Sequence, residues 1–466
     1  MGDELWSKSA SELAAMIRGG EVKSREVVEA HLSRIDDVNG AVNAVTVTLA
    51  DSALRTADDA DAAVATGAGL GPLHGVPFTI KENLDLAGSP TTQGVPALAQ
   101  AVPPVDAVVV ERMKAAGAIA LARTNLPEMG LRISTNNPLR GLTRNPWHPE
   151  LTAGGSSGGE AAALATGMTP IGLGNDLGGS LRNPAYCCGV TSLKPTSPGR
   201  IPMSSSQPPI DPPIGIQLMA TDGPMARRVA DLRVGLQVLA GWHRRDPRSV
   251  TAPLDAPGAP RRAALVTEID GAQLDPAVVA AVQKAATALR DAGYEVIEAE
   301  PPEMARVHEI WARVLSPDVA LMLGELTPIM SEGALGILRG LLERFPPDEL
   351  PSAFVFAERA RLGRAWSEFL AEFPVIVSPV WSGPPFAHDA DIEGEAGLDL
   401  TLDLLRPITP GNLLGIPSVA VPVGVEDGLP RGVQVYAERW CEQRCLDAAE
   451  AIEGDLGSIT PIDPVT

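Results

Sequence analysis

The sequence predicts an α/β fold in which a mixed central β-sheet is flanked by helices on both faces. Short apolar segments alternate with longer amphipathic ones between residues 75 and 173, and this order returns between residues 263 and 299. Such alternation is typical of a sheet that is covered by helices. Apolar residues make up 45% of the 466 residues and charged residues 20%, a composition that supports a sizeable core.

Three helices are expected at the start of the chain. Residues 9–18 carry apolar side chains at helical spacing, and Ser9 and Glu12 have the spacing of a capping box. Residues 24–38 repeat the apolar spacing. A third helix is expected over residues 49–65 and should end at the Thr and Gly residues that follow.

The sheet is expected to begin after the third helix. Strands are predicted at three apolar runs, 75–81, 118–122 and 171–173. Helices are predicted between them, at 106–116 and 160–166. A further strand–helix–strand unit is predicted at 263–266, 276–292 and 294–299.

The rest of the chain is expected to be loops and a helical cover. The stretches 204–215 and 241–260 contain Pro and have no periodicity, so we expect loops there. Between residues 305 and 372 the pattern is mostly helical, which indicates a cover beside the sheet. Because strand-like segments resume on both sides of each loop, we predict a single domain over residues 1–466.

Composition and cysteine usage exclude several classes of protein. With 37 Lys and Arg against 58 Asp and Glu, the formal net charge is −21, which argues against binding nucleic acid or an anionic membrane. The four cysteines have the spacing of neither a disulfide framework nor a zinc site. No signal peptide or membrane span is expected, so we predict a cytoplasmic protein.

Two serines, Ser156 and Ser180, each follow a pair of glycines. Neither of the common phosphate-binding glycine patterns is present, which disfavours a nucleotide site. Residues 155–159 fit G-x-S-x-G, which would make Ser157 the nucleophile of an α/β-hydrolase. That motif follows an apolar strand and needs a late histidine, whereas here a turn precedes it and His388 lies in a Pro- and Asp-rich loop.

A lysine can replace the missing histidine. Ser–Lys pairs substitute for Ser–His–Asp triads where the pKa of the amine falls from about 10.4 towards neutrality, as burial makes it do. Lys81 ends the apolar run 76–80 and is therefore a candidate base. A solvated lysine at the end of a strand is the ordinary alternative.

At four ordered motifs the sequence resembles the amidase signature family. They lie at residues 75–83, 154–159, 174–182 and 188–196. The spacing also agrees, with 75 residues (156 − 81) from Lys81 to Ser156 and 24 (180 − 156) from Ser156 to Ser180. Similar segments upstream and downstream extend the resemblance over nearly the whole chain, with a signature core at about 75–200.

The resemblance implies the amidase signature fold and a Ser-Ser-Lys triad. Lys81 corresponds to the general base, Ser156 to a bridging serine on a cis peptide bond, and Ser180 to the nucleophile. The implied oxyanion hole is formed by the backbone N–H groups of Leu177, Gly178, Gly179 and Ser180. Supporting roles are expected for Ser157, Asp176 and Arg182.

The implied activity is hydrolysis of a carbon–nitrogen amide bond through an acyl-Ser180 intermediate, with no metal and no cofactor. Since the family includes esterases and urethanases, the expected partner is a small amide, carbamate or ester, bound by a monomer or homodimer. Three alternatives remain: a glutaminase-type subunit of a tRNA-dependent amidotransferase, an esterase using Ser157, and a non-catalytic binding protein.

Two departures from the usual family residues concern the site. Asn175 stands where Thr or Ser is common, close to the predicted nucleophile turn. Trp381 stands where a Thr is common and is expected to line the substrate pocket.

Overall fold

One large sheet organises the molecule. The computed structural model describes residues 2–66, 69–205, 211–255 and 258–466. Within these residues, eleven strands pair in the order β1-β3-β2-β6-β8-β7-β12-β13-β11-β9-β10. Their bounds are β1 Val45–Thr48, β2 Pro77–Lys81, β3 Ile119–Thr124, β6 Ile171–Asp176, β7 Thr191–Lys194, β8 Thr221–Ala226, β9 Arg262–Leu265, β10 Glu295–Glu298, β11 Val375–Pro379, β12 Ser418–Glu426 and β13 Leu429–Tyr436. The short strands β4 Arg144–Asn145 and β5 His148–Thr152 pair separately.

The sheet is mixed, as predicted. Strands β3, β2 and β6 run parallel to one another, and so do β11, β9 and β10. The strands between these two groups pair antiparallel. The parallel groups are the places where helices connect successive strands, because a parallel pair needs a long crossover.

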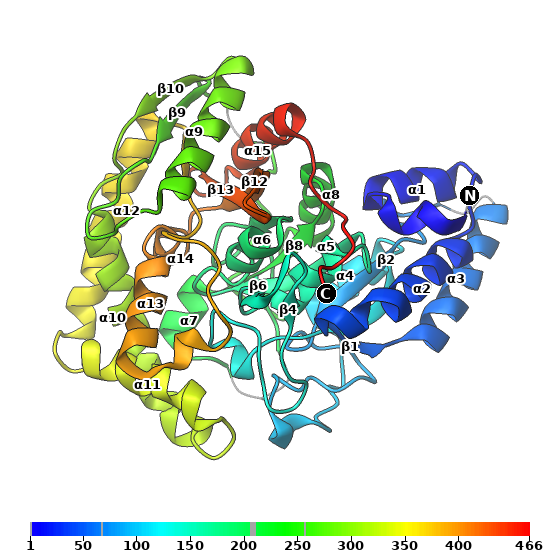
Figure 1. Cartoon of the computed structure of the whole chain (residues 1–466), viewed down its shortest axis with the longest axis horizontal. Helices are drawn as coiled ribbons and strands as arrows, with labels where there is room; N and C mark the ends of the chain where they lie inside the picture. Colours follow the sequence, from blue (N-terminus) through cyan, green and yellow to red (C-terminus); the bar gives the residue numbers. More distant parts are fainter. Residues whose placement is uncertain (1, 67–68, 206–210, 256–257) are drawn as a thin grey trace.

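Helices cover both faces of the sheet (Figure 1). Their bounds are α1 Ala10–Arg18, α2 Ser24–Val42, α3 Ala50–Ala65, α4 Val108–Ala115, α5 Gly158–Ala165, α6 Arg182–Cys188, α7 Ile214–Met219, α8 Val229–Leu239, α9 Pro276–Asp291, α10 Met304–Leu326, α11 Glu332–Arg344, α12 Ser352–Glu372, α13 Gly394–Leu405, α14 Thr409–Leu413 and α15 Glu442–Leu456. Short 3₁₀ turns are η1 Gly2–Ser7, η2 Pro96–Leu98, η3 Glu128–Gly130 and η4 Ala390–Ile392.

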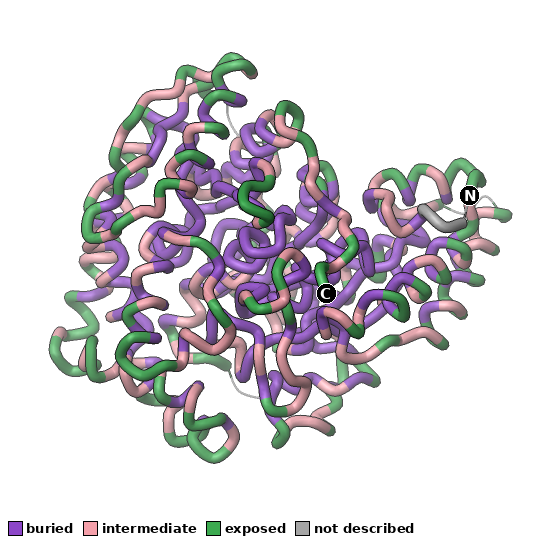
Figure 2. Tube along the Cα trace, viewed as in Figure 1, coloured by how far each residue is buried: buried purple, intermediate pink, exposed green. Residues whose placement is uncertain are grey.

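The sheet separates two apolar cores. On one face, α1, α4, α8, α9 and α15 contribute buried side chains; on the other, α5, α6 and the long helices α10–α13 do so. Figure 2 shows the buried residues concentrated along the sheet and the helices next to it, with exposed residues at the periphery. Because helices pack on both faces of the sheet, the strands are buried on both sides, which explains why they are apolar throughout.

The predicted elements are largely present. Ser9 Oγ accepts the Glu12 N–H at 3.2 Å and Glu12 Oε2 accepts the Ser9 N–H at 2.8 Å, so the capping box is confirmed. The segment 305–372 is mostly helical, as expected, and consists of α10, α11 and α12 with short connections between them. Of the loop predicted at 204–215, residues 206–210 lie outside the described residues, and α7 begins at Ile214.

Candidate active site

Three distant motifs meet at one edge of the sheet. Lys81 is the last residue of β2, and its parallel neighbour β6 ends shortly before Ser180. The carboxyl ends of parallel strands lie at the same edge, where α/β proteins usually place their sites. Ser156 precedes α5 and Ser180 precedes α6, and these two helices pack against each other on one face of the sheet.

The Lys81 side chain is fully buried and contacts the first of these serines. Its Nζ donates to Ser156 Oγ at 2.7 Å and to Asn175 Oδ1 at 2.7 Å. Burial lowers the pKa of Lys81 to about 7, although three nearby carboxylates act to raise it. A large fraction of the amine is therefore neutral near pH 7 and able to accept a proton.

The two serine turns are joined through Ser157. The Gly155–Ser156 peptide bond is cis, as the resemblance implied. A Cβ at position 155 would lie 2.6 Å from the carbonyl oxygen of Arg132, so only glycine fits there. The Ser157 N–H donates to the Ser180 carbonyl oxygen at 3.2 Å. Ser157 Oγ is buried and has no hydrogen-bond partner within the described residues, a position without access for a substrate.

A buried ion pair supports the turn that carries Ser180. Asp176 accepts the N–H of Gly179 at 2.8 Å and of Leu181 at 3.2 Å. Arg182 donates to both carboxylate oxygens of Asp176 at 3.1 Å. Burial would raise the pKa of Asp176, but the charge and hydrogen bonds of Arg182 hold it well below its usual range. The turn is thus fixed around a permanent negative charge.

The backbone N–H groups of the turn divide into two sets. The Gly179 N–H is taken by Asp176, which differs from the expectation that it faces the oxyanion hole. In the part of the chain that the structure describes, no acceptor takes the N–H groups of Leu177, Gly178 and Ser180. These three residues are also partly exposed, whereas Gly179 is buried. Three donors therefore remain available to an oxygen atom of a substrate.

Lys194, the other lysine near the motifs, has a structural place. Burial lowers its pKa to about 7, as it does for Lys81. Its Nζ donates to the carbonyl oxygens of Pro195 (2.8 Å) and Ile416 (3.1 Å) and to Ser197 Oγ (3.2 Å). All three of its donors are thereby used to hold a loop.

Two tryptophans beside the nucleophile turn come from distant parts of the chain. Trp311 of α10 donates from Nε1 to the Leu177 carbonyl oxygen at 3.3 Å, and a Cβ at position 178 would lie 2.9 Å from Trp311 Cζ2. No local pattern in the sequence identifies Trp311 as a site residue.

The expectation that Trp381 lines the substrate pocket is wrong, because its side chain is fully buried. Its Nε1 donates to Asn183 Oδ1 at 2.7 Å. Asn183 Nδ2 in turn lies 3.3 Å from the carbonyl oxygens of Gly155 and Gly178. Trp381 therefore supports the two glycine turns indirectly, by holding the side chain of Asn183 that links them.

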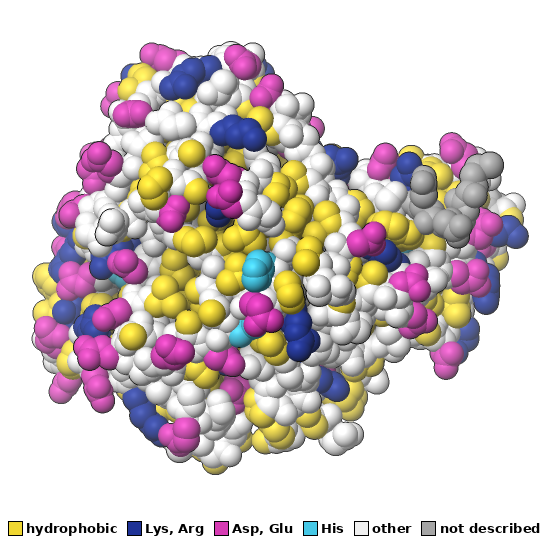
Figure 3. All heavy atoms as spheres, viewed as in Figure 1, with side chains coloured by type: hydrophobic (Ala, Val, Ile, Leu, Met, Phe, Trp, Pro, Cys, Tyr) yellow, Lys and Arg dark blue, Asp and Glu magenta, His cyan; other side chains and the backbone are white. Residues whose placement is uncertain are grey.

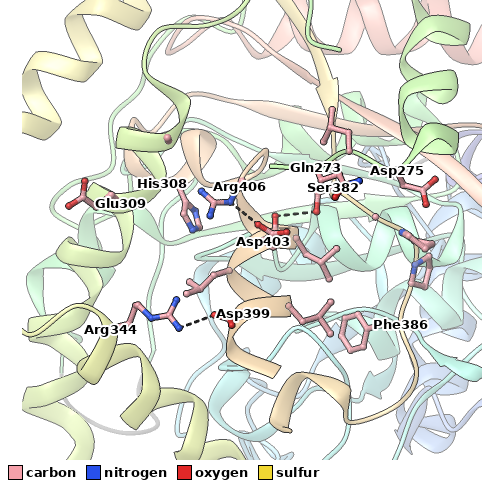
Figure 4. Close-up of a pocket in the computed structure, with 18 of the residues that line it drawn as sticks. Gln273, Asp275, His308, Glu309, Arg344, Ser382, Phe386, Asp399, Asp403 and Arg406 are labelled. Atoms are coloured by element: carbon pink, nitrogen blue, oxygen red, sulfur yellow. Dashed lines mark hydrogen bonds and ion pairs between the residues drawn. The ribbon is translucent and has the colours of Figure 1, made fainter. Parts of the chain in front are cut away.

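A cavity of about 940 Å³ is lined by neighbours of the two tryptophans, among them His308 and Phe386 (Figure 4). His308 in its wall stacks on Trp311 with ring centroids 6.0 Å apart, and Phe386 stacks on Trp381 at 5.7 Å. The rim also carries two ion pairs, Arg344–Asp399 at 2.8 Å and Arg406–Asp403 at 2.9 Å. Trp311 therefore contacts a wall residue of this cavity, His308, and also Gly178 of the nucleophile turn.

Charged side chains of both signs are interspersed over much of the surface on the face in Figure 3. None of the described helices is long and apolar enough to cross a bilayer. Among the described residues, no three His, Cys, Asp or Glu side chains are grouped so that they could hold a metal ion.

Comparisons with known proteins agree over almost the entire chain. The family model named Amidase matches residues 26–446. An indoleacetamide hydrolase of Bradyrhizobium diazoefficiens is 42% identical over 97% of this chain and 87% of that protein. A glutamyl-tRNA(Gln) amidotransferase subunit of Salinispora tropica is 32% identical over 98% of this chain and 99% of that protein. The solved structure of 6-aminohexanoate cyclic dimer hydrolase in complex with substrate has a TM-score of 0.84 at 27% identity, and the match covers 97% of this chain and 98% of that chain.

Proposed function

The chain belongs to the amidase family, and on this premise we propose that it hydrolyses carbon–nitrogen amide bonds with Ser180 as nucleophile, Ser156 as proton relay and Lys81 as base. The observation that carries the proposal is the 2.7 Å hydrogen bond from Lys81 Nζ to Ser156 Oγ in a fully buried position. Burial keeps the pKa of this lysine near 7, which is where a general base works best at neutral pH.

The first half of the reaction forms an ester with the enzyme. Ser180 Oγ attacks the amide carbon and passes its proton to Ser156 Oγ, while Ser156 passes its own proton to Lys81 Nζ. The negative charge that develops on the carbonyl oxygen is stabilised by the N–H groups of Leu177, Gly178 and Ser180. Preorganised donors of this kind typically lower a barrier by about 3–4 kcal/mol each.

The second half releases the products. The relay runs in reverse, so that the departing nitrogen takes a proton and leaves as an amine or ammonia. A water molecule then gives its proton to the same relay and attacks the acyl-Ser180 carbonyl carbon. Collapse of this second intermediate frees the carboxylic acid and restores the Ser180 hydroxyl.

For the substrate we propose the primary amide of an aryl-substituted acetic acid. The support is twofold: a relative of 42% identity is an indoleacetamide hydrolase, and the indole of Trp311 borders the nucleophile turn. Aromatic rings prefer offset-stacked or edge-to-face contacts, which favours an aryl group beside Trp311. Carbamates and aryl esters present the same planar carbonyl and are the expected side activities.

The alternatives are less well supported. The amidotransferase relative is 32% identical to this chain, against 42% for the indoleacetamide hydrolase, so glutamine hydrolysis for a partner chain is the second candidate. Ser157 is fully buried, which disfavours an esterase that attacks through this residue. A binding protein without activity would have no need of a neutral buried lysine against Ser156.

We further propose a single-domain enzyme of the cytoplasm, acting as a monomer or homodimer without nucleic acid. The net charge of −21 supports the absence of a nucleic-acid partner. All four cysteines are free and buried, as suits a reducing compartment. In this proposal residues 75–200 are the signature core, and helices α10–α12 form the cover on the substrate side.

A turnover screen tests the proposal. Aryl acetamides, anilides, aryl carbamates, aryl esters and glutamine are offered to the wild-type chain and to Ser180→Ala. We expect the aryl acetamides to be the best substrates and Ser180→Ala to lose at least a thousandfold in kcat. Strict use of glutamine would favour the amidotransferase hypothesis, and full activity of a folded Ser180→Ala would overturn the mechanism.

A further inference from the structure

A short segment, residues 128–132, lies against the turn that carries Ser156. A Cβ at position 130 would be 3.4 Å from Ser156 Oγ, and a Cβ at position 155 would be 2.6 Å from the Arg132 carbonyl oxygen. A methyl group would therefore just fit beside the Ser156 hydroxyl. The position of Gly130 sets the width of this space.

The backbone of this segment has an unusual conformation. Met129 and Gly130 both have positive φ, 51° and 68°. A residue with a long side chain, such as Met, rarely adopts this left-handed conformation, and it persists where surrounding contacts fix it. The contacts that fix the two ends of the segment come from the helical cover and the turn next to it.

Glu128 fixes the first end. It is buried, and its carboxylate accepts both the N–H and the hydroxyl of Ser331, each at 2.6 Å. Ser331 is the N-cap of α11, where its Oγ also accepts the Ala334 N–H at 3.4 Å. A carboxylate at a helix N-terminus is favoured by the helix dipole. Glu128 is thereby bound to the start of a cover helix.

Arg132 fixes the second end. Its side chain is 3% exposed and donates from Nε and Nη2 to the two carboxylate oxygens of Asp391, at 3.0 Å and 2.8 Å. Asp391 is fully buried in η4, and Asp389 accepts from the same Nη2 at 2.6 Å. The turn η4 packs on α11, where a Cβ at position 333 would be 2.9 Å from Ile392 Cδ1. Both ends of the segment are thus joined to one part of the molecule.

We propose that Glu128 and Arg132 are positioning residues that hold Gly130 beside Ser156 and so keep the Ser156 hydroxyl directed at Lys81. A serine side chain has several staggered rotamers, and the relay uses the one that places Oγ 2.7 Å from Lys81 Nζ. When the segment moves away, the space beside Oγ widens, and water or another rotamer competes with the relay. This inference rests on the proposed role of Ser156 and adds that the cover holds it in place.

Ser331 provides the sharpest test because it is exposed and lies outside the catalytic residues. Its hydroxyl has two roles: it donates to Glu128, and it caps α11. Ser331→Asp keeps the second role, since Asp is a good N-cap residue, but it places a carboxylate against Glu128. Ser331→Thr keeps both roles. The two variants therefore separate the contact with Glu128 from the stability of α11.

The measurements are the rate at which a fluorophosphonate labels Ser180 and the steady-state kinetics on an aryl acetamide. For Ser331→Asp we expect labelling and kcat to fall about tenfold, because the relay is misplaced, while KM stays within about twofold. Ser331→Thr should equal the wild type. Glu332→Gln breaks the exposed ion pair with Arg339 on the same helix; it is the matched control and should also equal the wild type.

A compensating substitution tests the contact itself. In Ser331→Asp combined with Glu128→Gln, the amide oxygen accepts the N–H of residue 331, and the amide N–H donates to the introduced carboxylate. This double variant should regain most of the lost rate. A general weakening of α11 would not be reversed by Glu128→Gln.

Wild-type labelling and turnover in Ser331→Asp would overturn the inference, and so would a double variant no faster than Ser331→Asp alone. Should Ser331→Asp not fold, Arg132→Lys decides in its place. This variant keeps the charge but loses the bidentate contact with Asp391, so wild-type rates would again overturn the inference.

The wild type and Ser180→Ala are labelled in the same series. A wild type that is not labelled, or a Ser180→Ala that is, would defeat the proposed function and this inference with it. Wild-type rates in the variants of a reactive enzyme would defeat only the roles of Glu128 and Arg132.

Discussion

The indole ring of Trp311 lies against Gly178, so close that a Cβ at position 178 would be 2.9 Å from Trp311 Cζ2. Trp311 Nε1 also donates to the neighbouring Leu177 carbonyl oxygen at 3.3 Å. The side chain of a distant helix therefore fixes the backbone whose N–H groups we propose as the oxyanion hole. This contact makes the turn sensitive to changes on either side of it.

Adding a methyl group at position 178 should disrupt this arrangement. We expect Gly178→Ala to lower kcat on an aryl acetamide by about a hundredfold, because the turn must move and displace an oxyanion donor. Phenylalanine lacks the second ring of the indole, so Gly178→Ala combined with Trp311→Phe should regain part of the loss. Kinetics of both single variants and the double variant give the comparison; a double variant no better than Gly178→Ala would contradict the steric explanation.

Removing the indole should connect the site to the cavity of about 940 Å³ that has His308 in its wall. For Trp311→Ala we expect kcat/KM to fall about fivefold on an aryl acetamide, since one aromatic contact is worth about 1 kcal/mol. On amides with bulkier acyl groups the loss should be smaller, or reversed. Competition between a small and a large amide measures the change in preference, and an unchanged ratio would mean that Trp311 does not separate the two spaces.

Replacing Lys81 by methionine should abolish activity and stabilise the fold at low pH. Because the pKa of Lys81 is lower in the folded protein than in the unfolded chain, the wild type loses stability as pH falls from about 10 to about 7, and the loss then stays constant. Lys81→Met is free of this loss. Denaturant titrations at pH 6 and pH 10 should show the larger stabilisation at pH 6, by about 2 kcal/mol or more; equal differences at both values would contradict burial as the cause.

The Asp176–Arg182 ion pair should be worth far more than an exposed one. Both side chains are fully buried, so Asp176→Asn leaves an uncompensated guanidinium and is expected to cost about 3–5 kcal/mol. Asp58→Asn, which breaks the exposed pair with Arg25, is the matched control and should leave Tm unchanged. Thermal unfolding of the two variants makes the test, and similar shifts would show that burial does not set the difference.

The two adjacent serines should differ sharply. Ser156→Ala removes the group between Lys81 and Ser180, and we expect kcat to fall by at least a thousandfold. Ser157→Ala removes a buried hydroxyl that has no partner among the described residues, and its activity should stay within about threefold of wild type. The opposite order would favour an esterase mechanism through Ser157.

Much of the fold could be predicted because it depends on local patterns. The capping box at Ser9 and Glu12 and the strand that ends at Lys81 are properties of a few neighbouring residues. The order of the strands was not predictable, since β7 pairs with β12 although more than 200 residues separate them. Pairing between strands so distant in the chain depends on how all the helices and strands pack together, and a local pattern does not contain this information.

The sequence by itself determined the residue types of the candidate site and their spacing, because the glycine-rich turns and the intervals between the motifs can be read directly from the order of the residues. Only the tertiary structure decided what surrounds these residues. The burial that lowers the pKa of Lys81, the indole over Gly178 and the hydrogen bonds between Glu128 and Ser331 each join segments far apart in sequence. The physical reason is that the pKa of a desolvated amine is set by its complete surroundings, and no local pattern contains them.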